Sequence, residues 1–422
     1  MRYQGPRSLW LRYFDPKHGV VEVTLVVEDG VVKRSIRGFE RVLGVDSHLD
    51  LSNLGIAIPG AIDIHEHLRG LELEHKEDEV SGSLAAAKGG FTLVIDMPNT
   101  RPEVRSIDVA QKKLESLRLA VVDYGLLVGL PQKASELREM LYLPGVVGLK
   151  LYPEDLPRFE KSFAAEVSRA KALLVVHAEH PMLIKEACGP GERWLCRPVE
   201  AEIAFLTELR GKIVEGVRLH VTHVTNVATL AYAKRIGATV DTCPHYILLS
   251  SDDERSLGCL AKVNPPLRPP GVGEELLSWL PLVDALSTDH APHTAEEKSA
   301  DFSECPSGIA SNEIALSLTL DLVSRGLLVV DDVVRLWSLG PARILGLTQW
   351  GCIEEGCVAS YTILDMKRVV KVDPSMFVSK AKVSPYTGWK LQGAVAATVV
   401  RGRAVYLEGE FLERCCGEPV GA

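Results

Sequence analysis

Eight short apolar runs recur along the middle of this chain, and helical patterns fill most of the gaps between them. The runs cover residues 56–64, 91–96, 124–128, 146–151, 173–177, 219–223, 238–243 and 283–288. Helical patterns cover residues 79–88, 107–119, 159–172, 199–209, 227–236 and 309–324. Strands that alternate with helices form parallel sheets, and eight such units close a (β/α)8 barrel. The alternation therefore predicts an α/β fold of the TIM-barrel type, ahead of a doubly wound open sheet, whose Gly-rich phosphate turn after the first strand is absent.

The two ends of the chain carry a different pattern. Short β-type runs at 21–27 and 31–36 are separated by Asp-Gly and Gly turns, and similar runs return at 357–364 and 396–407. This pattern is typical of hairpins. We expect residues 1–57 and 346–422 to fold together into one small β-sandwich domain, beside a barrel formed by residues 58–345. Two separate β appendages are the alternative.

The 422 residues carry a net charge of −9, and no basic block offsets the acidic excess. This balance argues against a general nucleic-acid binder. No apolar stretch is long enough for a membrane helix, and the N-terminus lacks the basic-then-apolar pattern of a signal peptide. We therefore expect a cytoplasmic protein that contacts neither nucleic acid nor a membrane.

Nine cysteines are scattered along the chain, without a Cys-x-x-Cys pair. This pattern disfavours a secreted disulfide framework and a structural zinc knuckle, so most of the cysteines are expected to be buried thiols. Asn and Gln together number only about ten, a composition found in heat-adapted proteins. Because intracellular proteins of such organisms do contain disulfides, a disulfide among the nine is left open.

Chemically reactive side chains cluster directly after the apolar runs. They are His65, His67 and Arg69 after the first run, the segment 96–100 with Asn99 after the second, Lys150 in the fourth, His177 in the fifth, His220 and His223 in the sixth, and Asp289 and His293 after the eighth. The carboxyl ends of barrel strands are where active sites lie. Alternate residues of a strand share a face, so His65 and His67 point the same way and could share a metal.

Each of these residues alone also has a structural interpretation. Lys150 could be an inward lysine paired with a carboxylate, His177 a core histidine, and Asp289 a helix N-cap. His220 and His223 cannot both face inward on one straight strand, so at least one of them is expected to be structural. The cluster as a whole is nevertheless hard to produce by chance.

Neutral imidazoles and carboxylate oxygens suit zinc or a similar divalent ion. An unmodified lysine ammonium has no lone pair to donate, but Lys150 carboxylated by carbon dioxide would present two oxygens that could bridge two metals. Such a site would lower the pKa of a bound water to near neutrality. Asp289 could hold one metal and pass a proton to a leaving nitrogen.

With these residues in place, the chain resembles the amidohydrolase superfamily and, within it, the dihydroorotases. The resemblance covers essentially the whole chain. Its most specific pieces are Pro59-Gly-Ala-Ile-Asp-Ile-His-Glu-His-Leu-Arg69, Gly89-Gly-Phe-Thr92, Asp96-Met-Pro-Asn-Thr100, Gly148-Leu-Lys-Leu-Tyr152, Val176-His-Ala-Glu179, Arg197-Pro-x-Glu-Ala-Glu202, His220-Val-Thr-His223, Asn264-Pro-Pro-Leu-Arg268 and Thr288-Asp-His-Ala-Pro-His293.

The resemblance implies two divalent metal ions, expected to be zinc, and a role for each residue. The implied metal ligands are His65, His67 and Asp289 at one ion, His177 and His223 at the other, and carboxylated Lys150 between them. The implied substrate residues are Arg69, Asn99 and His293 at the substrate carboxylate, with Arg268 near the substrate. The implied reaction is the reversible, metal-assisted conversion of L-dihydroorotate and water to N-carbamoyl-L-aspartate in pyrimidine biosynthesis, with Asp289 as the catalytic residue.

Two segments depart from the family pattern. Gly70-Leu-Glu72 stands where the family usually has Glu-Pro-Gly, and Pro244-His-Tyr246 stands where it usually has Pro-His-His. The first departure leaves the geometry of the loop that carries Arg69 open. Neither departure removes an implied ligand.

Three alternatives to a dihydroorotase are left open. Allantoinase and hydantoinase share the metal site, but their substrates lack the carboxylate that an Arg69 clamp would bind. An inactive homologue that scaffolds aspartate transcarbamoylase would be expected to lack a ligand, and none is missing. A homo-oligomer, and an association of an active enzyme with aspartate transcarbamoylase, also remain open.

Overall fold

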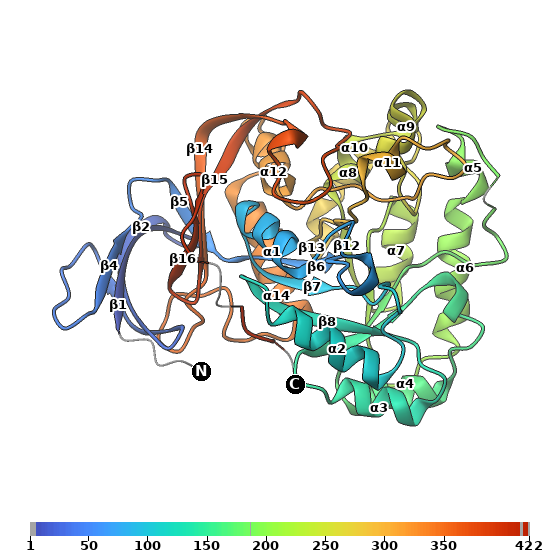
Figure 1. The fold of residues 1–422 in the computed structure, drawn as a ribbon, viewed down its shortest axis with the longest axis horizontal. Helices are drawn as coiled ribbons and strands as arrows, with labels where there is room; N and C mark the ends of the chain where they lie inside the picture. The colour runs from blue at the N-terminus through green and yellow to red at the C-terminus, as the bar shows by residue number, and fades with distance from the viewer. Residues whose placement is uncertain (1–5, 186, 414–416, 421–422) are drawn as a thin grey trace.

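The computed structural model describes residues 6–185, 187–413 and 417–420. Residues 1–5, on which the expected absence of a signal peptide partly rests, lie outside these ranges, as do Cys415 and Cys416. Figure 1 shows a barrel surrounded by helices and, beside it, a sheet made from both ends of the chain. Within the described ranges, no helix is long and apolar enough to cross a membrane.

The barrel consists of eight strands that pair in chain order and run parallel. They are β6 (Ala61–Glu66), β7 (Phe91–Asp96), β8 (Asp123–Gly129), β9 (Val146–Leu151), β10 (Leu173–Val176), β11 (Arg218–Val221), β12 (Thr239–Thr242) and β13 (Ala285–Leu286). A parallel bridge between Glu66 and His290 joins the last strand region to the first. The predicted (β/α)8 barrel is therefore confirmed.

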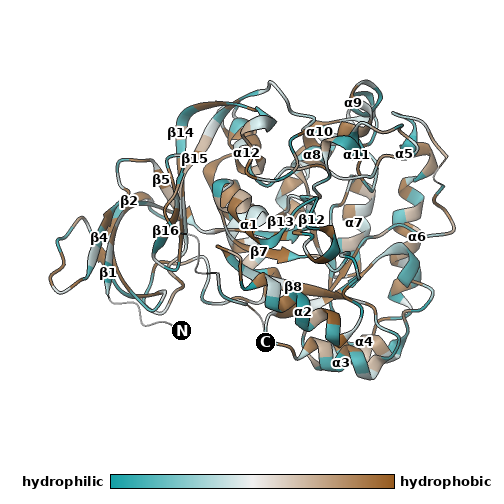
Figure 2. Ribbon diagram, viewed as in Figure 1, coloured by the Kyte–Doolittle hydropathy of each residue, from teal (hydrophilic) through white to brown (hydrophobic). Residues whose placement is uncertain are grey.

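Helices follow the barrel strands and cover the outside of the barrel (Figure 1). They are α1 (Glu79–Lys88), α2 (Ile107–Leu117), α3 (Ala134–Leu141), α4 (Lys161–Arg169), α5 (Arg193–Cys196), α6 (Val199–Arg210), α7 (Val227–Arg235), α8 (Pro244–Leu248), α9 (Ser251–Leu257), α10 (Val272–Ser278), α11 (Ala295–Lys298), α12 (Ala315–Ser324), α13 (Val330–Val334) and α14 (Gly340–Leu345). In Figure 2, β8 is coloured mainly as hydrophobic, whereas α3 and α4 alternate between hydrophilic and hydrophobic stretches. This is the pattern of strands buried on both faces beneath amphipathic helices.

The two chain ends fold together, as predicted, and their described strands form one nine-stranded sheet. Its strands are β1 (Arg7–Asp15), β2 (Gly19–Glu28), β3 (Val31–Arg37), β4 (Ser47–Asp50), β5 (Ile56–Pro59), β14 (Tyr361–Lys371), β15 (Lys390–Val400), β16 (Arg403–Leu407) and β17 (Glu410–Phe411). Residues from both chain ends share one apolar core, in which the rings of Tyr13 and Tyr361 meet edge to face at 6.3 Å. The sheet therefore bends over its own core instead of forming two separate appendages.

The apolar run at 56–64 is divided between the two sheets. Strand β5 pairs with β14 and contacts β1, whereas β6 starts the barrel at Ala61. Gly60 separates them, and a Cβ atom there would lie 2.2 Å from the Thr92 hydroxyl. The chain therefore passes from the end sheet to the barrel at Gly60, where only glycine fits.

The cysteines differ from expectation. In the described part of the chain, three disulfides join Cys188 to Cys196, Cys259 to Cys305 and Cys352 to Cys357. Among the cysteines within the described ranges, Cys243 is the free one, and it is buried. The expectation that most cysteines are buried thiols is therefore wrong, because folding brings together pairs whose sequence positions carry no recognisable disulfide spacing.

Candidate active site

A cavity of about 430 Å³ opens at the carboxyl ends of the barrel strands. Nine of the ten residues to which the resemblance assigns a role line it: His65, His67, Arg69, Asn99, Lys150, His177, His223, Asp289 and His293. Residues separated by more than 200 positions in the chain thus meet in one cavity. The exception is Arg268, which is not in the wall of this cavity.

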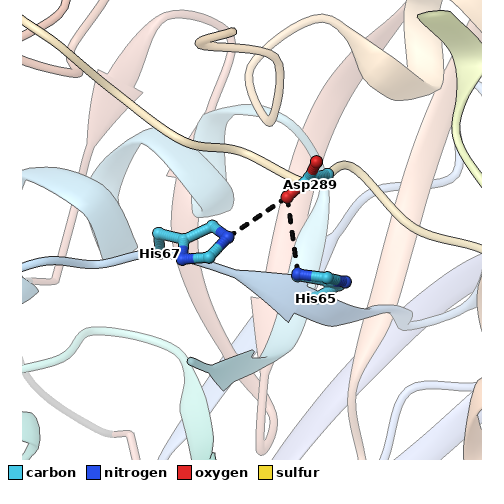
Figure 3. A group of neighbouring side chains, drawn as sticks. All are labelled: His65, His67 and Asp289. Carbon is cyan, nitrogen blue, oxygen red and sulfur yellow. Dashed lines mark hydrogen bonds and ion pairs between the residues drawn. The ribbon is translucent and has the colours of Figure 1, made fainter. Parts of the chain in front are cut away.

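His65, His67 and Asp289 converge on one point (Figure 3). Asp289 Oδ1 lies 3.1 Å from His67 Nε2 and 3.4 Å from His65 Nε2. All three side chains are buried. Burial by itself would raise the pKa of Asp289, but the neighbouring His67 lowers it, so the pKa lies below its usual value.

Hydrogen bonds at the Nδ1 atoms of His65 and His67 determine that the Nε2 atom of each ring faces the cavity. His67 Nδ1 donates to Asn99 Oδ1 at 2.6 Å, and His65 Nδ1 lies 2.5 Å from the Thr222 hydroxyl. The Thr222 hydroxyl itself donates to Asp241, so it accepts from His65. Both Nε2 atoms therefore carry lone pairs directed at a carboxylate oxygen, an arrangement that a cation between them would satisfy.

Asp63 holds the first and last barrel strands together beneath this group. Its Oδ1 atom accepts hydrogen bonds from the backbone amides of His65 and Thr288, both at 3.1 Å. The Thr288 hydroxyl donates to the same carboxylate. Asp63 thereby fixes His65 and the residue before Asp289 at once. Its position two residues before His65, on the same face of the strand, was the only available sequence signal.

Lys150 is fully buried, and its Nζ atom has no hydrogen-bond partner among the described residues. The centroid of the Tyr152 ring lies 5.5 Å from Nζ. Burial lowers the pKa of Lys150 to about 7. An unpaired amine in this position is costly as an ammonium. The neutral amine is the form that reacts with carbon dioxide, so the surroundings of Lys150 fit a carboxylated lysine.

His177 and His223 form the other side of the donor group. Their ring centroids are 4.6 Å apart, and that of His223 lies 5.1 Å from that of His65. His177 Nε2 donates to Glu179 at 2.6 Å, which leaves its Nδ1 with a lone pair. His223 Nδ1 is buried and has no hydrogen-bond partner within the described ranges. Burial lowers the pKa of His223 well below its ordinary value, so its ring is neutral.

Two buried carboxylates that the sequence analysis did not assign to the site orient these histidines. Glu179 accepts hydrogen bonds from His177 and from Arg197, whose Nε and Nη2 atoms lie 3.0 and 2.6 Å away. Asp241 accepts from the backbone amide of His223 at 2.6 Å. The place of Glu179 in the Val176-His-Ala-Glu179 motif was the available signal for that residue, whereas Asp241 stands in no such motif.

Three site residues have backbone conformations that side chains rarely adopt. The φ angles of Arg69, His223 and Asp289 are 56°, 45° and 46°. Such left-handed conformations cost about 1–3 kcal/mol each and persist where the surrounding structure enforces them. They turn the chain at the ends of the strands, which aims these side chains into the cavity.

The donor set fits a pair of divalent cations. Four imidazoles, one carboxylate and a lysine surround one cavity, and two of their donor atoms, Lys150 Nζ and His223 Nδ1, are buried without a hydrogen-bond partner among the described residues. Nitrogen and oxygen donors in this proportion suit zinc and similar borderline ions. His65, His67 and Asp289 are close enough together to share one ion.

Arg69 and His293 face each other across the same cavity, next to the proposed metal ligands. Arg69 Nη2 lies 3.3 Å from His293 Nε2, and Lys76 Nζ lies 3.2 Å from His293 Nδ1. Burial and these two cations lower the pKa of His293 to about 2. Arg69 Nε is buried without a hydrogen-bond partner in the described part of the chain. The altered segment after Arg69 thus leaves its side chain directed into the cavity, where it could bind a carboxylate.

Arg268 and His220 lie away from the cavity. The Arg268 guanidinium donates to the Arg197 carbonyl oxygen at 2.7 Å and to the carboxylate of Glu202. His220 bonds to Asp241 at 2.7 Å. His220 is therefore the structural member of the His220 and His223 pair. The structure does not bring Arg268 to the substrate cavity, because its charge is used to hold neighbouring segments together.

Lys298 lies beneath the loop that carries Ser307 and Gly308 of the cavity wall, and it bonds to the Pro306 carbonyl oxygen at 3.0 Å. Burial and neighbouring cations lower the pKa of Lys298 to about 7. Between about pH 7 and 10 the unfolded chain therefore binds a proton that the folded chain does not, so stability should rise with pH in this range.

Replacing Lys298 by methionine is accordingly expected to raise the free energy of unfolding at pH 7 by about 1–3 kcal/mol and to reduce its rise at higher pH. Denaturant unfolding of both proteins at neutral and alkaline pH measures this. Lys234→Met is a control, since Lys234 forms an ordinary ion pair with Asp284. Equal pH profiles for wild type and Lys298→Met would contradict the prediction.

Comparison with known proteins shows the family to which the chain belongs. The model of the amidohydrolase family matches residues 56–405. A dihydroorotase from Saccharolobus solfataricus is 36% identical over 356 residues, which are 84% of this chain and 85% of that protein. A dihydroorotase from Geobacter metallireducens is 35% identical, over 94% of this chain and 98% of that protein.

A solved structure, the L-hydantoinase (dihydropyrimidinase) from Arthrobacter aurescens, superimposes with a TM-score of 0.87 and 26% sequence identity. It covers 97% of this chain and 98% of that one. Because the family model spans most of the sequence and the dihydroorotases are 35–36% identical over most of their length, the chain belongs to the amidohydrolase family and, within it, groups with the dihydroorotases.

Proposed function

We propose that this protein catalyses the reversible conversion of L-dihydroorotate and water to N-carbamoyl-L-aspartate, the dihydroorotase reaction of pyrimidine biosynthesis. The observation that carries the proposal is one cavity that holds both a metal-type donor set and a cationic group. His65, His67 and Asp289 supply the first, and Arg69 beside His293 supplies the second. A cyclic amide that bears a carboxylate needs both features.

Each side chain has a part in the proposal. His65, His67 and Asp289 would hold one divalent ion, expected to be zinc, and His177 and His223 would hold a second, with carboxylated Lys150 between them. When bound, such ions polarise a carbonyl group and lower the pKa of water to near neutrality. Arg69, Asn99 and His293 would bind the substrate carboxylate. Arg268 is assigned a structural part in place of substrate contact, since it bonds to Glu202 and Arg197.

Asp289 would move the proton. Its pKa lies below the usual value, so it starts as a carboxylate able to accept a proton from the attacking water. Its position in the cavity wall would let it pass this proton to the ring nitrogen as the amide bond breaks. In the reverse direction the same carboxylate would accept the proton of the attacking ureido nitrogen.

Hydantoinase activity is the second candidate, favoured by the similarity in fold to the Arthrobacter aurescens L-hydantoinase. Allantoinase activity would use the same donors. Neither hydantoin nor allantoin carries a ring carboxylate, and a buried Arg69 with an unpaired Nε atom would then be left without a counter-charge. This cost argues for the carboxylated substrate.

The direct test is turnover of L-dihydroorotate, allantoin and hydantoin by zinc-supplemented protein, with metal content assayed on the same sample. We expect selective hydrolysis of dihydroorotate at about two metal ions per chain. Bound metal with hydrolysis of hydantoin or allantoin alone would overturn the substrate assignment. We also propose that the protein forms a homo-oligomer and associates with aspartate transcarbamoylase. Size-exclusion chromatography of the protein alone tests the first, and chromatography of its mixture with aspartate transcarbamoylase tests the second.

Arg69→Ala is expected to raise KM for dihydroorotate by roughly 30- to 100-fold with a smaller change in kcat, because a charge-assisted bond to the substrate carboxylate is lost. Steady-state kinetics measures both constants. The matched control is Arg193→Ala, since Arg193 is a similarly buried arginine that pairs with Glu254 outside the cavity wall. An unchanged KM in Arg69→Ala would remove Arg69 from the carboxylate clamp.

A further inference from the structure

A fully buried lysine lies behind the loop that carries Arg69. Lys113, on α2, is 0% exposed and does not line the cavity. Its Nζ atom lies 2.9 Å from the Arg69 carbonyl oxygen, 2.7 Å from Glu79 Oε1 and 2.8 Å from Asp96 Oδ2. The ammonium donates hydrogen bonds to the Arg69 carbonyl oxygen and to Glu79, and it forms an ion pair with Asp96.

These contacts hold both sides of Arg69. Asp96 Oδ1 accepts hydrogen bonds from the backbone amides of Leu68 and Met97, each at 2.9 Å. Asp96 thus binds the backbone amide of Leu68, the residue before Arg69, while Lys113 binds the carbonyl oxygen of Arg69 itself. Between the two contacts, Arg69 has a φ angle of 56°. A left-handed arginine is unfavourable by itself and needs such restraints to persist.

The altered sequence after Arg69 fits the same network. Gly70 has φ 64° and ψ −165°, a conformation open essentially only to glycine. A Cβ atom on Gly70 would lie 2.2 Å from Glu79 Oε1, the atom that bonds to Lys113. Ser116 also donates to this oxygen at 2.7 Å. The carboxylate of Glu79 therefore occupies the space into which a side chain at position 70 would project.

The charges of Lys113, Glu79 and Asp96 nearly cancel. One ammonium lies between two carboxylates, all buried. Removing the ammonium would leave two buried carboxylates without their counter-charge, and the Arg69 carbonyl oxygen would lose its hydrogen-bond donor. The position of this loop therefore depends on the lysine and not only on the packing around it.

We propose that Lys113 is a positioning residue that holds Arg69 in the conformation required to bind the substrate carboxylate. The proposal rests on the proposed function, because it assigns Lys113 a part in binding a carboxylated substrate. Lys113 itself does not contact the substrate. Its effect reaches the substrate only through the backbone of Arg69.

The test is a double-mutant comparison of Lys113→Met, Arg69→Ala and the combined variant, with kcat, KM and metal content measured for each. Lys113→Met is expected to raise KM for dihydroorotate about tenfold, with kcat and metal content close to those of the wild type. In the Arg69→Ala background, Lys113→Met should add nothing, because the group through which it acts is already gone. Lys234→Met is the control, because Lys234 is a helix lysine that pairs with Asp284.

Three outcomes would overturn the proposal: an unchanged KM in Lys113→Met, a loss confined to kcat or to the folded fraction, or a tenfold effect that persists in the Arg69→Ala background. If Lys113→Met does not fold, Glu79→Gln replaces it, since this variant keeps the shape of the side chain and weakens its hold on Lys113. The same comparison then applies, with an expected KM increase of about threefold.

Wild-type kinetics separates this inference from the proposed function. Absence of dihydroorotate turnover in the metal-loaded wild type would overturn the proposed function and this inference with it. Normal wild-type turnover with an unchanged KM in Lys113→Met would overturn the positioning role alone.

Discussion

Asp289→Ala is expected to lower kcat for dihydroorotate by at least about 1,000-fold while the barrel stays folded. Two functions are lost at once, since Asp289 lies within ligand distance of His65 and His67 and is the proposed proton carrier. Asp289 contacts solvent-accessible cavity space and not the apolar core, so its removal leaves no large cavity. Turnover and metal content together report the two functions.

The variant Asp289→Asn distinguishes the loss of the proton-carrying carboxylate from an effect of backbone strain at position 289. The φ angle of Asp289 is 46°, and asparagine adopts this conformation more readily than alanine does. Asp289→Asn should therefore unfold at nearly the wild-type temperature and still lose turnover, because an amide cannot carry the proton. Turnover at the wild-type rate in either variant would refute the proposed mechanism.

Lys150→Met is expected to reduce turnover to a similar extent and to lower the metal content of the protein. A methionine side chain cannot form a carbamate, so the proposed bridging oxygens would be lost. The metal-free protein should keep its stability, because the variant removes a buried amine that has no hydrogen-bond partner among the described residues. Elemental analysis, steady-state kinetics and thermal unfolding of the same preparation measure the three effects.

A matched control for Lys150 is Lys113→Met, which removes another fully buried lysine without removing a proposed ligand. Its metal content should stay close to that of the wild type. Full turnover and full metal content in Lys150→Met would exclude a carboxylated lysine at this position.

Local patterns predicted the regular elements well where they are bounded by strong signals. The predicted helix at 79–88 and the predicted strands at 91–96 and 146–151 coincide with α1, β7 and β9. The run at 283–288 was less informative, since only Ala285–Leu286 form β13. Beyond Leu286 the backbone and side chains bond to Asp63 and Thr242 instead of continuing a regular ladder.

The metal-type residues were predictable because strand periodicity and barrel topology place them at one end of the fold. The position of Arg268 was not predictable, because its motif does not indicate whether the guanidinium faces the substrate or Glu202. The supporting residues Asp241 and Lys113 gave no sequence signal of their own. Each acts through partners that lie far away in the chain, such as His220 for Asp241 and Arg69 for Lys113.

The sequence by itself determined the fold class, the joining of the two chain ends and the inventory of donors at the strand ends, because these follow from periodicity and residue chemistry. Only the tertiary structure decided which donors share the cavity, that Lys150 Nζ has no hydrogen-bond partner among the described residues, and that Lys113 bonds to the Arg69 carbonyl oxygen. Side-chain direction at the end of a strand depends on single φ angles, such as 45° at His223. Those angles are enforced by contacts between distant segments, which no local pattern contains.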